Sequence, residues 1–325
     1  MAGPILSLDA SSYRRHAIHG SDRAWAETNC YADVLIELIH SIGFEPIAAL
    51  PFTLTADFEV DQWTFFKFRH VDLWNLYGLE IQELNPWRDL AGHVEAQVAG
   101  GRHVLVEVDS FFLPDTQGTA YRKAHVKSTI AVNSIDVAAA RMGYFHGQGY
   151  FEVGGDDFRN LFQLDGLVHE RMLPPYIEIV KHHRTPASSD LPTLVAKSVE
   201  ALRSQLEMMP VENPFPRFRH RFEEDLPWLS GQPIDTFHEY AFATLRQYGA
   251  CFELAHTYLT WLGQHGEAAG EAARAEYRLI SDEAKMLQFK LARSIARGKP
   301  LDLSPVDNMA DAWARAREVL HAAWG

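Results

Sequence analysis

The pattern of apolar and polar residues changes near residue 185. Before that point, short segments alternate apolar and polar side chains, which is the period of a strand with one buried face. The clearest of them, Arg102–Leu113, follows a turn at Gly100 and Gly101. Two helices accompany the strands, one from about Cys30 to Ser41 and one from about Pro86 to Val98. Further strands are predicted at His125–Asp136, Met142–Val153 and Pro174–His183.

Beyond residue 185 the pattern is helical almost to the end. Thr185–Pro192 has the composition of a linker with a helix-start signal. Helices are predicted at Thr193–Met208, Ile234–Gln264, Glu267–Arg297 and Asn308–Ala323. The sequence therefore predicts an α+β protein with two domains, an α/β domain over residues 1–185 and a helical domain over residues 190–325.

The composition is that of a globular protein with a substantial core. Of the 325 residues, 47% are hydrophobic and 22% are charged, which argues against global disorder. The net charge of -13 disfavours nucleic acid and anionic membrane surfaces as partners. No segment approaches the roughly 20 apolar residues of a membrane span. Two cysteines and a poor signal-peptide pattern indicate a cytoplasmic protein.

Cys30 is the first candidate for chemistry. Asn29 is a good N-cap, so that Cys30 falls in the first turn of an apolar helix. The unsatisfied amides and the helix dipole favour a thiolate there, and the same amides can donate to an oxyanion. The alternative is a buried small hydrophobe, because free cysteines are among the most buried residues.

His125 is the candidate base. It opens a predicted strand 95 residues after Cys30, and a strand end can hold a base rigidly across from a helix N-terminus. The alternative is an ordinary surface residue, since the chain has 16 histidines.

A cysteine that begins a helix, followed by a distant histidine that begins a strand, resembles the layout of papain-like folds. The front half is similar to the N-terminal domain of the butirosin biosynthesis H protein family, which is papain-like and takes acyl groups from carrier-protein thioesters. The similarity lies in the Cys30 helix, the phrase VEVDSFFLP at Val106–Pro114, and His125 with its strand. The whole chain is identified as a member of the DUF1839 family by SLDASSYRRH, DQWTFFKF and LPPYIEIVK.

The resemblance implies a third residue that orients the histidine ring, an Asp or Asn on the next strand. The corresponding segment, GYFHGQGYFEV, has neither. His146 is the first choice for this role and Asp109 the acidic alternative. The resemblance also implies an upstream glutamine in the oxyanion hole, which this chain lacks; Asn29 or Trp25 is the expected substitute.

The function that the resemblance implies is acyl transfer through Cys30. An acyl or peptidyl carrier protein would present the thioester on phosphopantetheine, and a small-molecule amine or hydroxyl would accept the acyl group. No cofactor or metal is expected beyond the donor's own arm. Arg122, Lys123 and Lys127 are the expected docking patch for the carrier protein. The alternatives are a papain-like cysteine hydrolase and a non-catalytic binding protein on the same scaffold.

Overall fold

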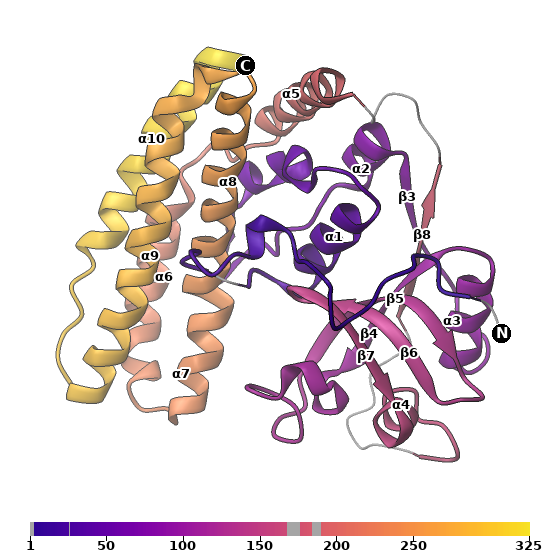
Figure 1. The fold of residues 1–325 in the computed structure, drawn as a ribbon. Helices are drawn as coiled ribbons and strands as arrows, with labels where there is room; N and C mark the ends of the chain where they lie inside the picture. Colours follow the sequence, from indigo (N-terminus) through magenta and orange to yellow (C-terminus); the bar gives the residue numbers. More distant parts are fainter. Residues whose placement is uncertain (1–2, 26, 168–175, 184–189) are drawn as a thin grey trace. The chain divides into compact units, whose positions relative to one another are not determined.

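The chain forms two compact units in a computed structural model that describes residues 3–25, 27–167, 176–183 and 190–325 (Figure 1). The first unit comprises residues 1–20, 29–46 and 73–189, and the second comprises residues 21–28, 47–72 and 190–325. The change of unit near residue 190 coincides with the change in sequence pattern. Two short segments of the front half nevertheless belong to the helical unit. Most of the predicted linker, Thr185–Pro192, lies outside the described residues.

The first unit is built on a six-stranded sheet in the order β3-β8-β4-β5-β6-β7, in which every neighbouring pair is antiparallel. The strands are β3 (Leu79–Glu83), β4 (His103–Asp109), β5 (Lys127–Asp136), β6 (Arg141–His146), β7 (Gly149–Gly154) and β8 (Ile177–His182). The predicted strand Arg102–Leu113 is confirmed as β4, but β4 ends earlier because the Asp109 carboxylate accepts the N–H of Phe111 and begins a 3₁₀ turn. The predicted strand Met142–Val153 is the hairpin β6–β7, which turns at Gly147. Pro174, where the last strand was expected to begin, lies outside the described residues.

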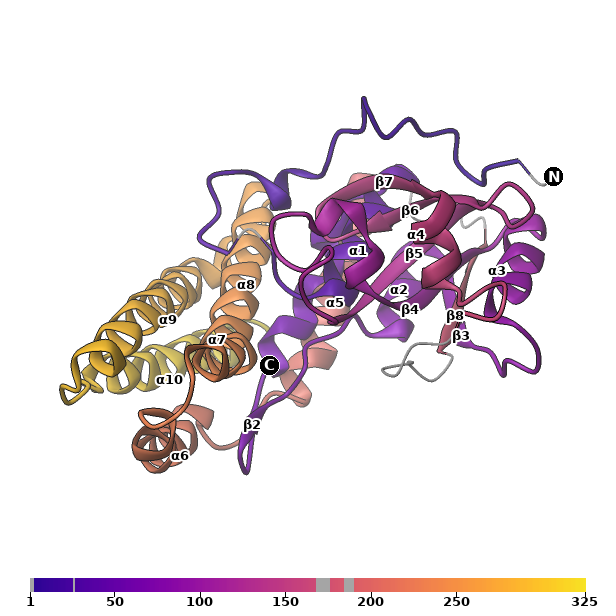
Figure 2. The same ribbon diagram turned by 90° about the horizontal axis from the view of Figure 1, so that it is seen from below.

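Different helices cover the two faces of this sheet. Val106 and Val108 of β4 and Ile130 of β5 belong to one core cluster, together with residues of α3 (Leu90–Ala99) and α4 (Gly155–Leu161). Because side chains alternate along a strand, Glu107 and Thr129 stand on the opposite face. Helix α1 packs against β5 and β6 on that face (Figures 1 and 2).

Helix α1 (Cys30–Ser41) is confirmed at both ends. The Asn29 side chain accepts the N–H of Ala32 at 2.9 Å and caps the first turn, as the sequence predicts. Gly43, with φ of 90°, supplies the left-handed conformation that follows the last turn. Nine of the twelve residues of α1 are buried, so the helix is held over most of its length.

The N-terminal segment is attached to α1 by a buried ionic network. His19 places Nδ1 at 2.5 Å from Oε1 of Glu37 and Nε2 at 3.2 Å from Oδ1 of Asp33. Tyr13 donates its hydroxyl to Oε2 of Glu37 at 2.5 Å. Burial alone would lower the pKa of His19, but the hydrogen bonds to Asp33 and Glu37 outweigh it and raise that pKa to about 9. His19 is therefore a buried cation between two carboxylates on one face of α1.

The second unit is helical, with α8, α9 and α10 packed against one another. The predicted helix Ile234–Gln264 is interrupted by a π-turn at Phe242–Arg246. One helix of this unit, α6, is absent from the prediction. The helices of this unit are α2 (His70–Tyr77, which begins in the second unit and ends in the first), α5 (Leu191–Glu207), α6 (Pro214–Leu229), α7 (Ile234–Ala241), α8 (Gln247–Gln264), α9 (Glu271–Arg297) and α10 (Ser304–Trp324), with a 3₁₀ helix at Pro46–Thr55.

The two front-half segments join the helical unit through buried contacts. Trp25 donates its indole N–H to Ser281 at 2.9 Å, and its backbone N–H to Glu253 at 3.0 Å. The small hairpin of β1 (Phe58–Glu59) and β2 (Gln62–Trp63) packs its rings against aromatic residues of α6 and α8. These long-range contacts explain why the units are not continuous in sequence.

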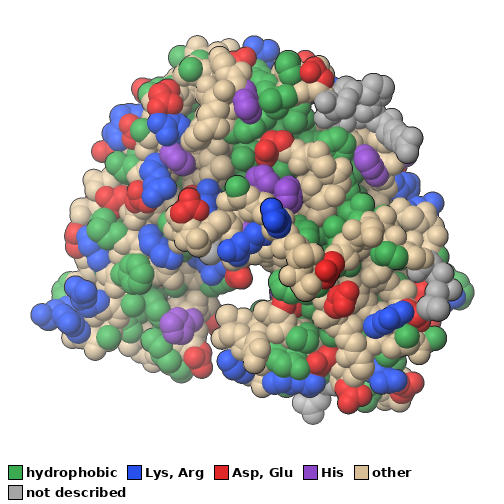
Figure 3. All heavy atoms as spheres, viewed as in Figure 1, with side chains coloured by type: hydrophobic (Ala, Val, Ile, Leu, Met, Phe, Trp, Pro, Cys, Tyr) green, Lys and Arg blue, Asp and Glu red, His purple; other side chains and the backbone are tan. Residues whose placement is uncertain are grey.

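The surface carries both signs of charge. On the face shown in Figure 3, acidic and basic side chains are interspersed and neither sign forms a continuous area. Among the described helices, none is long and apolar enough to cross a bilayer.

Replacing His19 should destabilise the protein in a pH-dependent way. His19→Gln leaves two buried carboxylates without their cation, and we expect a loss of about 3 to 5 kcal/mol in the free energy of unfolding near pH 6. The pKa of His19 is raised by folding, so its stabilising contribution is complete below about pH 6.5 and is lost as the pH rises through about 9. Urea unfolding of both proteins between pH 6 and 9.5 measures this difference.

The control is His183→Gln, which removes an exposed histidine 2.8 Å from Glu80. It should cost under about 1 kcal/mol. A His19→Gln difference that is equally small, or that does not shrink toward pH 9.5, would contradict the buried-cation account.

Candidate active site

Cys30 is the first residue of α1 and is partly exposed. Its thiol lies 3.6 Å from the hydroxyl of Thr129 on β5. The side-chain oxygen of Asn29 is used in capping, as its bond to Ala32 shows, and Asn29 is buried. Cys30 therefore lies at a capped helix N-terminus, against the sheet face that α1 covers.

His125 is oriented by Asp109. Its Nδ1 lies 2.5 Å from Oδ2 of Asp109, the last residue of β4. The ring also stacks on Phe111, with 4.3 Å between centroids and 6° between planes. The His125 side chain is 37% exposed, and this arrangement leaves Nε2 directed away from Asp109. Of the two orienting residues weighed from the sequence, Asp109 is the one in contact with His125.

Cys30 and His125 contact different residues of the sheet, Thr129 of β5 and Asp109 of β4. In the pairing of β4 with β5, Thr129 lies opposite Glu107. Two residues further along the same face, Lys127 lies opposite Asp109. Lys127 and Glu107 form an ion pair at 2.8 Å between these positions. His125 precedes β5, which begins at Lys127, two residues later than the sequence predicts. Among the described residues, no hydrogen bond joins the Cys30 thiol to the His125 imidazole.

His146 is placed elsewhere, which corrects its proposed role as the partner of His125. Its Nε2 lies 2.6 Å from the hydroxyl of Ser128, and its Nδ1 lies 2.5 Å from Oδ2 of Asp115. Tyr144 donates its hydroxyl to the other oxygen of Asp115. Ser128 neighbours Thr129 in β5 and so points to the opposite face of the sheet. His146 therefore belongs to the face that α1 does not cover.

The Ser128–His146–Asp115 cluster has the atom order of a serine hydrolase triad. Its side chains are nearly buried, however, with 11% of His146 and 5% of Asp115 exposed. Asp115 lies in the segment between β4 and β5, which also contains Tyr121 and Arg122, both bonded to Asp157 of α4. We interpret the cluster as the anchor of this segment, residues 110–126, at whose end His125 lies.

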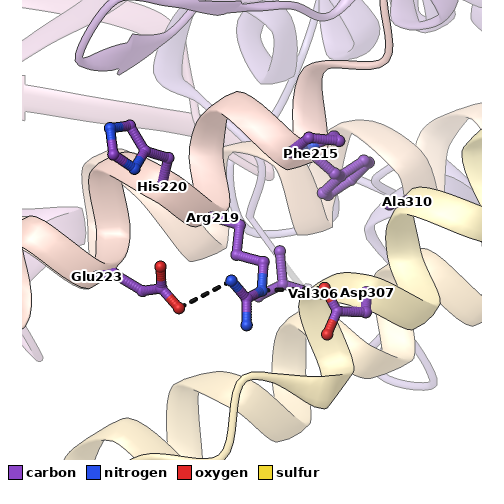
Figure 4. A pocket seen from close by; sticks show the side chains of 8 residues that line it. Phe215, Arg219, His220, Glu223, Val306, Asp307 and Ala310 are labelled. Carbon is purple, nitrogen blue, oxygen red and sulfur yellow. Dashed lines mark ion pairs between the residues drawn. The ribbon is translucent and has the colours of Figure 1, made fainter.

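The helical unit contains a recess of about 250 Å³ between α6 and α10 (Figure 4). Arg219 projects into it and pairs with Glu223 at 2.8 Å and with Asp307 at 3.0 Å. The guanidinium of Arg219 is matched by two carboxylates, and the exposed His220, which also lines the recess, lies 3.5 Å from Glu224. We interpret the recess as a junction between the two helices. Within the described ranges, no three His, Cys, Asp or Glu side chains are grouped as metal ligands.

Sequence reasoning missed Thr129, Glu107 and Asp115. Thr129 follows His125 by four residues, so alternation along the predicted strand His125–Asp136 would place both side chains on one face. Nothing local to Asp115 predicts its contact with His146, which is 31 residues away along the chain.

Removing the Asp115 carboxylate should loosen the segment that carries His125. Asp115→Ala breaks the bonds to His146 and Tyr144, and hydrogen bonds to a charged group contribute about 1.5 to 3 kcal/mol each. We expect faster amide hydrogen exchange across residues 110–126, with helix α1 unaffected. The control is Asp156→Ala, which removes an exposed carboxylate of α4. Unchanged exchange in residues 110–126 of Asp115→Ala would show that the cluster does not anchor this segment.

Comparison with known families gives the same division of the chain as the sequence pattern. The DUF1839 N-terminal domain matches residues 14–182, and the DUF1839 C-terminal domain matches residues 192–322. No curated protein matches the chain. The two family matches cover most of its length, and the chain belongs to the DUF1839 family.

Proposed function

We propose that this protein is a cysteine-dependent acyltransferase with a papain-like front domain. Cys30 would take an acyl or aminoacyl group from a carrier-protein thioester and pass it to an amine or hydroxyl. The observation that carries the proposal is the position of Cys30, a partly exposed thiol at the capped N-terminus of a buried helix that packs on an antiparallel sheet. Cys30 also lies in the part of the sequence on which the resemblance to the butirosin biosynthesis H protein family rests.

The thiol exchange uses the N-terminus of α1. The Cys30 thiolate attacks the thioester carbonyl, and the resulting oxyanion accepts hydrogen bonds from first-turn amides, which have no intrahelical acceptor. Asn29 already satisfies the amide of Ala32, so the amide of Cys30 is the natural donor. The tetrahedral intermediate then expels the arm's thiolate, which takes up a proton, and the acyl group remains on Cys30.

His125 and Asp109 serve the second half of the reaction. Because the His125 ring is bonded to Asp109 while the Cys30 thiol contacts Thr129, we assign His125 to the acceptor, from which it would remove a proton. Asp109 holds Nδ1, so that Nε2 is the proton acceptor. The acceptor then attacks the Cys30 thioester, and the sulfur leaves as the thiolate. A hydrolase would use the same residues with water as acceptor.

The cations of the expected docking patch have partners within the first unit. Arg122 is paired with Asp157, and Lys127 is paired with Glu107. Lys123 donates to the backbone oxygen of Gln117. Both ion pairs are partly exposed and therefore weak, so the expected docking patch stays a prediction.

A second candidate function is non-catalytic binding on a papain-like scaffold. The observation that favours it is that the Cys30 thiol contacts a threonine hydroxyl and not an imidazole. On this reading the front domain binds a ligand at the α1 N-terminus without covalent chemistry.

Alkylation by iodoacetamide at pH 7 separates the two functions. On the acyltransferase assignment, Cys30 should be alkylated faster than a cysteine in an unstructured peptide, because the nucleophile of an acyl transfer has to be reactive at this pH. Cys251 is an internal control, because it is fully buried and burial raises the pKa of its thiol. His125→Ala should leave the alkylation rate unchanged. Peptide mass spectrometry measures both cysteines in one sample.

Two results would change this assignment. A Cys30 that reacts no faster than the free peptide would favour the binding function. A rate that falls in His125→Ala would show that His125 acts on the thiol after all.

A further inference from the structure

A groove of about 510 Å³ runs along helix α9 in the helical unit. We call it the α9 groove and define it by Ala24, Asp282, Lys285, Met286, Phe289, Lys290 and Arg293. Lys285, Phe289 and Arg293 are four residues apart in turn, so they form one stripe of roughly 12 Å along the helix. The groove is therefore a linear feature two turns long.

Two large apolar side chains of the α9 groove face solvent. Phe289 is 66% exposed and Met286 is 40% exposed. Large exposed apolar side chains that are grouped and bordered by charges are typical of protein-binding surfaces.

The border of the groove is cationic although the chain has a net charge of -13. Lys285 lies over the ring of Trp25, 4.1 Å from its centroid, and Lys290 lies 3.4 Å from Asp302 in an exposed pair. Arg293 has no ion-pair partner among the described residues. The one acidic member, Asp282, is paired with Arg278. Screened, exposed pairs are weak, so these cations can interact with an incoming partner.

The groove adjoins the segment that leads to Cys30. The N–H groups of Ala24 and Trp25 both donate to the buried carboxylate of Glu253, at 2.9 and 3.0 Å. Ala24 precedes Cys30 by six residues, and six extended residues span at most roughly 20 Å. Chain length alone therefore limits how far the Ala24 end of the groove can lie from Cys30.

We propose that the α9 groove docks an acidic amphipathic helix of the carrier protein that delivers the thioester to Cys30. This proposal rests on the proposed acyltransferase function and names the docking surface of its donor. An apolar residue of the partner would cover Phe289 and Met286, while flanking carboxylates would meet Lys285, Lys290 and Arg293. Charge complementarity favours an acidic occupant, since three of the groove side chains are cationic. The length of the stripe matches a helix of about two turns.

Nucleic acid and membranes fit the groove less well. Three cations and one carboxylate provide far fewer phosphate contacts than the roughly 6 to 10 of a typical DNA-binding protein. The chain's net negative charge would oppose both polyanions beyond the groove.

Charge reversal tests the proposal. In the full chain, Lys285→Glu, Lys290→Glu and Arg293→Glu together should weaken binding of an acyl carrier protein with an acetylated phosphopantetheine arm at least tenfold. The matched control is Arg203→Glu, Arg297→Glu and Lys299→Glu, which reverses the same number of exposed cations outside the groove and should stay within twofold of wild type. Fluorescence anisotropy of the labelled carrier protein measures both, and Phe289→Ala alone should weaken binding at least threefold.

Acetylation by free acetylpantetheine, followed as a mass increase, separates this proposal from the function on which it rests. The groove variant should be acetylated on Cys30 at the wild-type rate, since the free arm needs no docking. The docking proposal would be overturned if the groove variant bound the carrier protein as tightly as wild type, or if wild type did not bind it. In either case, acetylation of Cys30 would still support the proposed function. Groove-dependent binding of a DNA duplex or of anionic phospholipid vesicles in place of the carrier protein would also overturn it.

Discussion

The burial of helix α1 against the six-stranded sheet is the constraint on which the site depends. Nine of its residues are buried, and the ionic contacts of His19 with Asp33 and Glu37 hold the N-terminal segment to its side. This packing leaves the first residue, Cys30, at the point where the helix meets Thr129 on the face of the sheet. At this position, the first-turn amides of the helix can donate hydrogen bonds to an oxyanion that forms beside the thiol.

The thiol and the base have different partners on the sheet. Cys30 contacts Thr129 of β5, whereas His125, which precedes β5, is held by Asp109 at the end of β4. This arrangement fits a transferase in which the sulfur carries the acyl group and a different group prepares the acceptor. It also gives the Asp109–His125 pair a role that does not need contact with Cys30.

Local sequence signals predicted where helices and strands lie, but not which side chains they bring into contact. The cap at Asn29 and the turn at Gly43 delimit α1, and alternation locates β4, because each depends on neighbouring residues only. The orienting residue of His125 could not be selected in this way. Asp109 and His146 were both plausible until strand pairing placed them on opposite faces. Helix α6 has a local start signal in the Asn213 cap and Pro214, but it also contains Pro227, and a proline argues against a helix interior.

The central claim is that Cys30 carries an acyl group as a thioester. Intact-protein mass spectrometry after rapid acid quench, with an acylated pantetheine as donor, tests it most directly. The account predicts a mass increase of one acyl group that hydroxylamine removes, that Cys30→Ala abolishes, and that persists in His125→Ala because transfer to the acceptor is blocked. Absence of the adduct in wild type and in His125→Ala across a panel of acyl and aminoacyl pantetheines would contradict the claim and leave a binding protein.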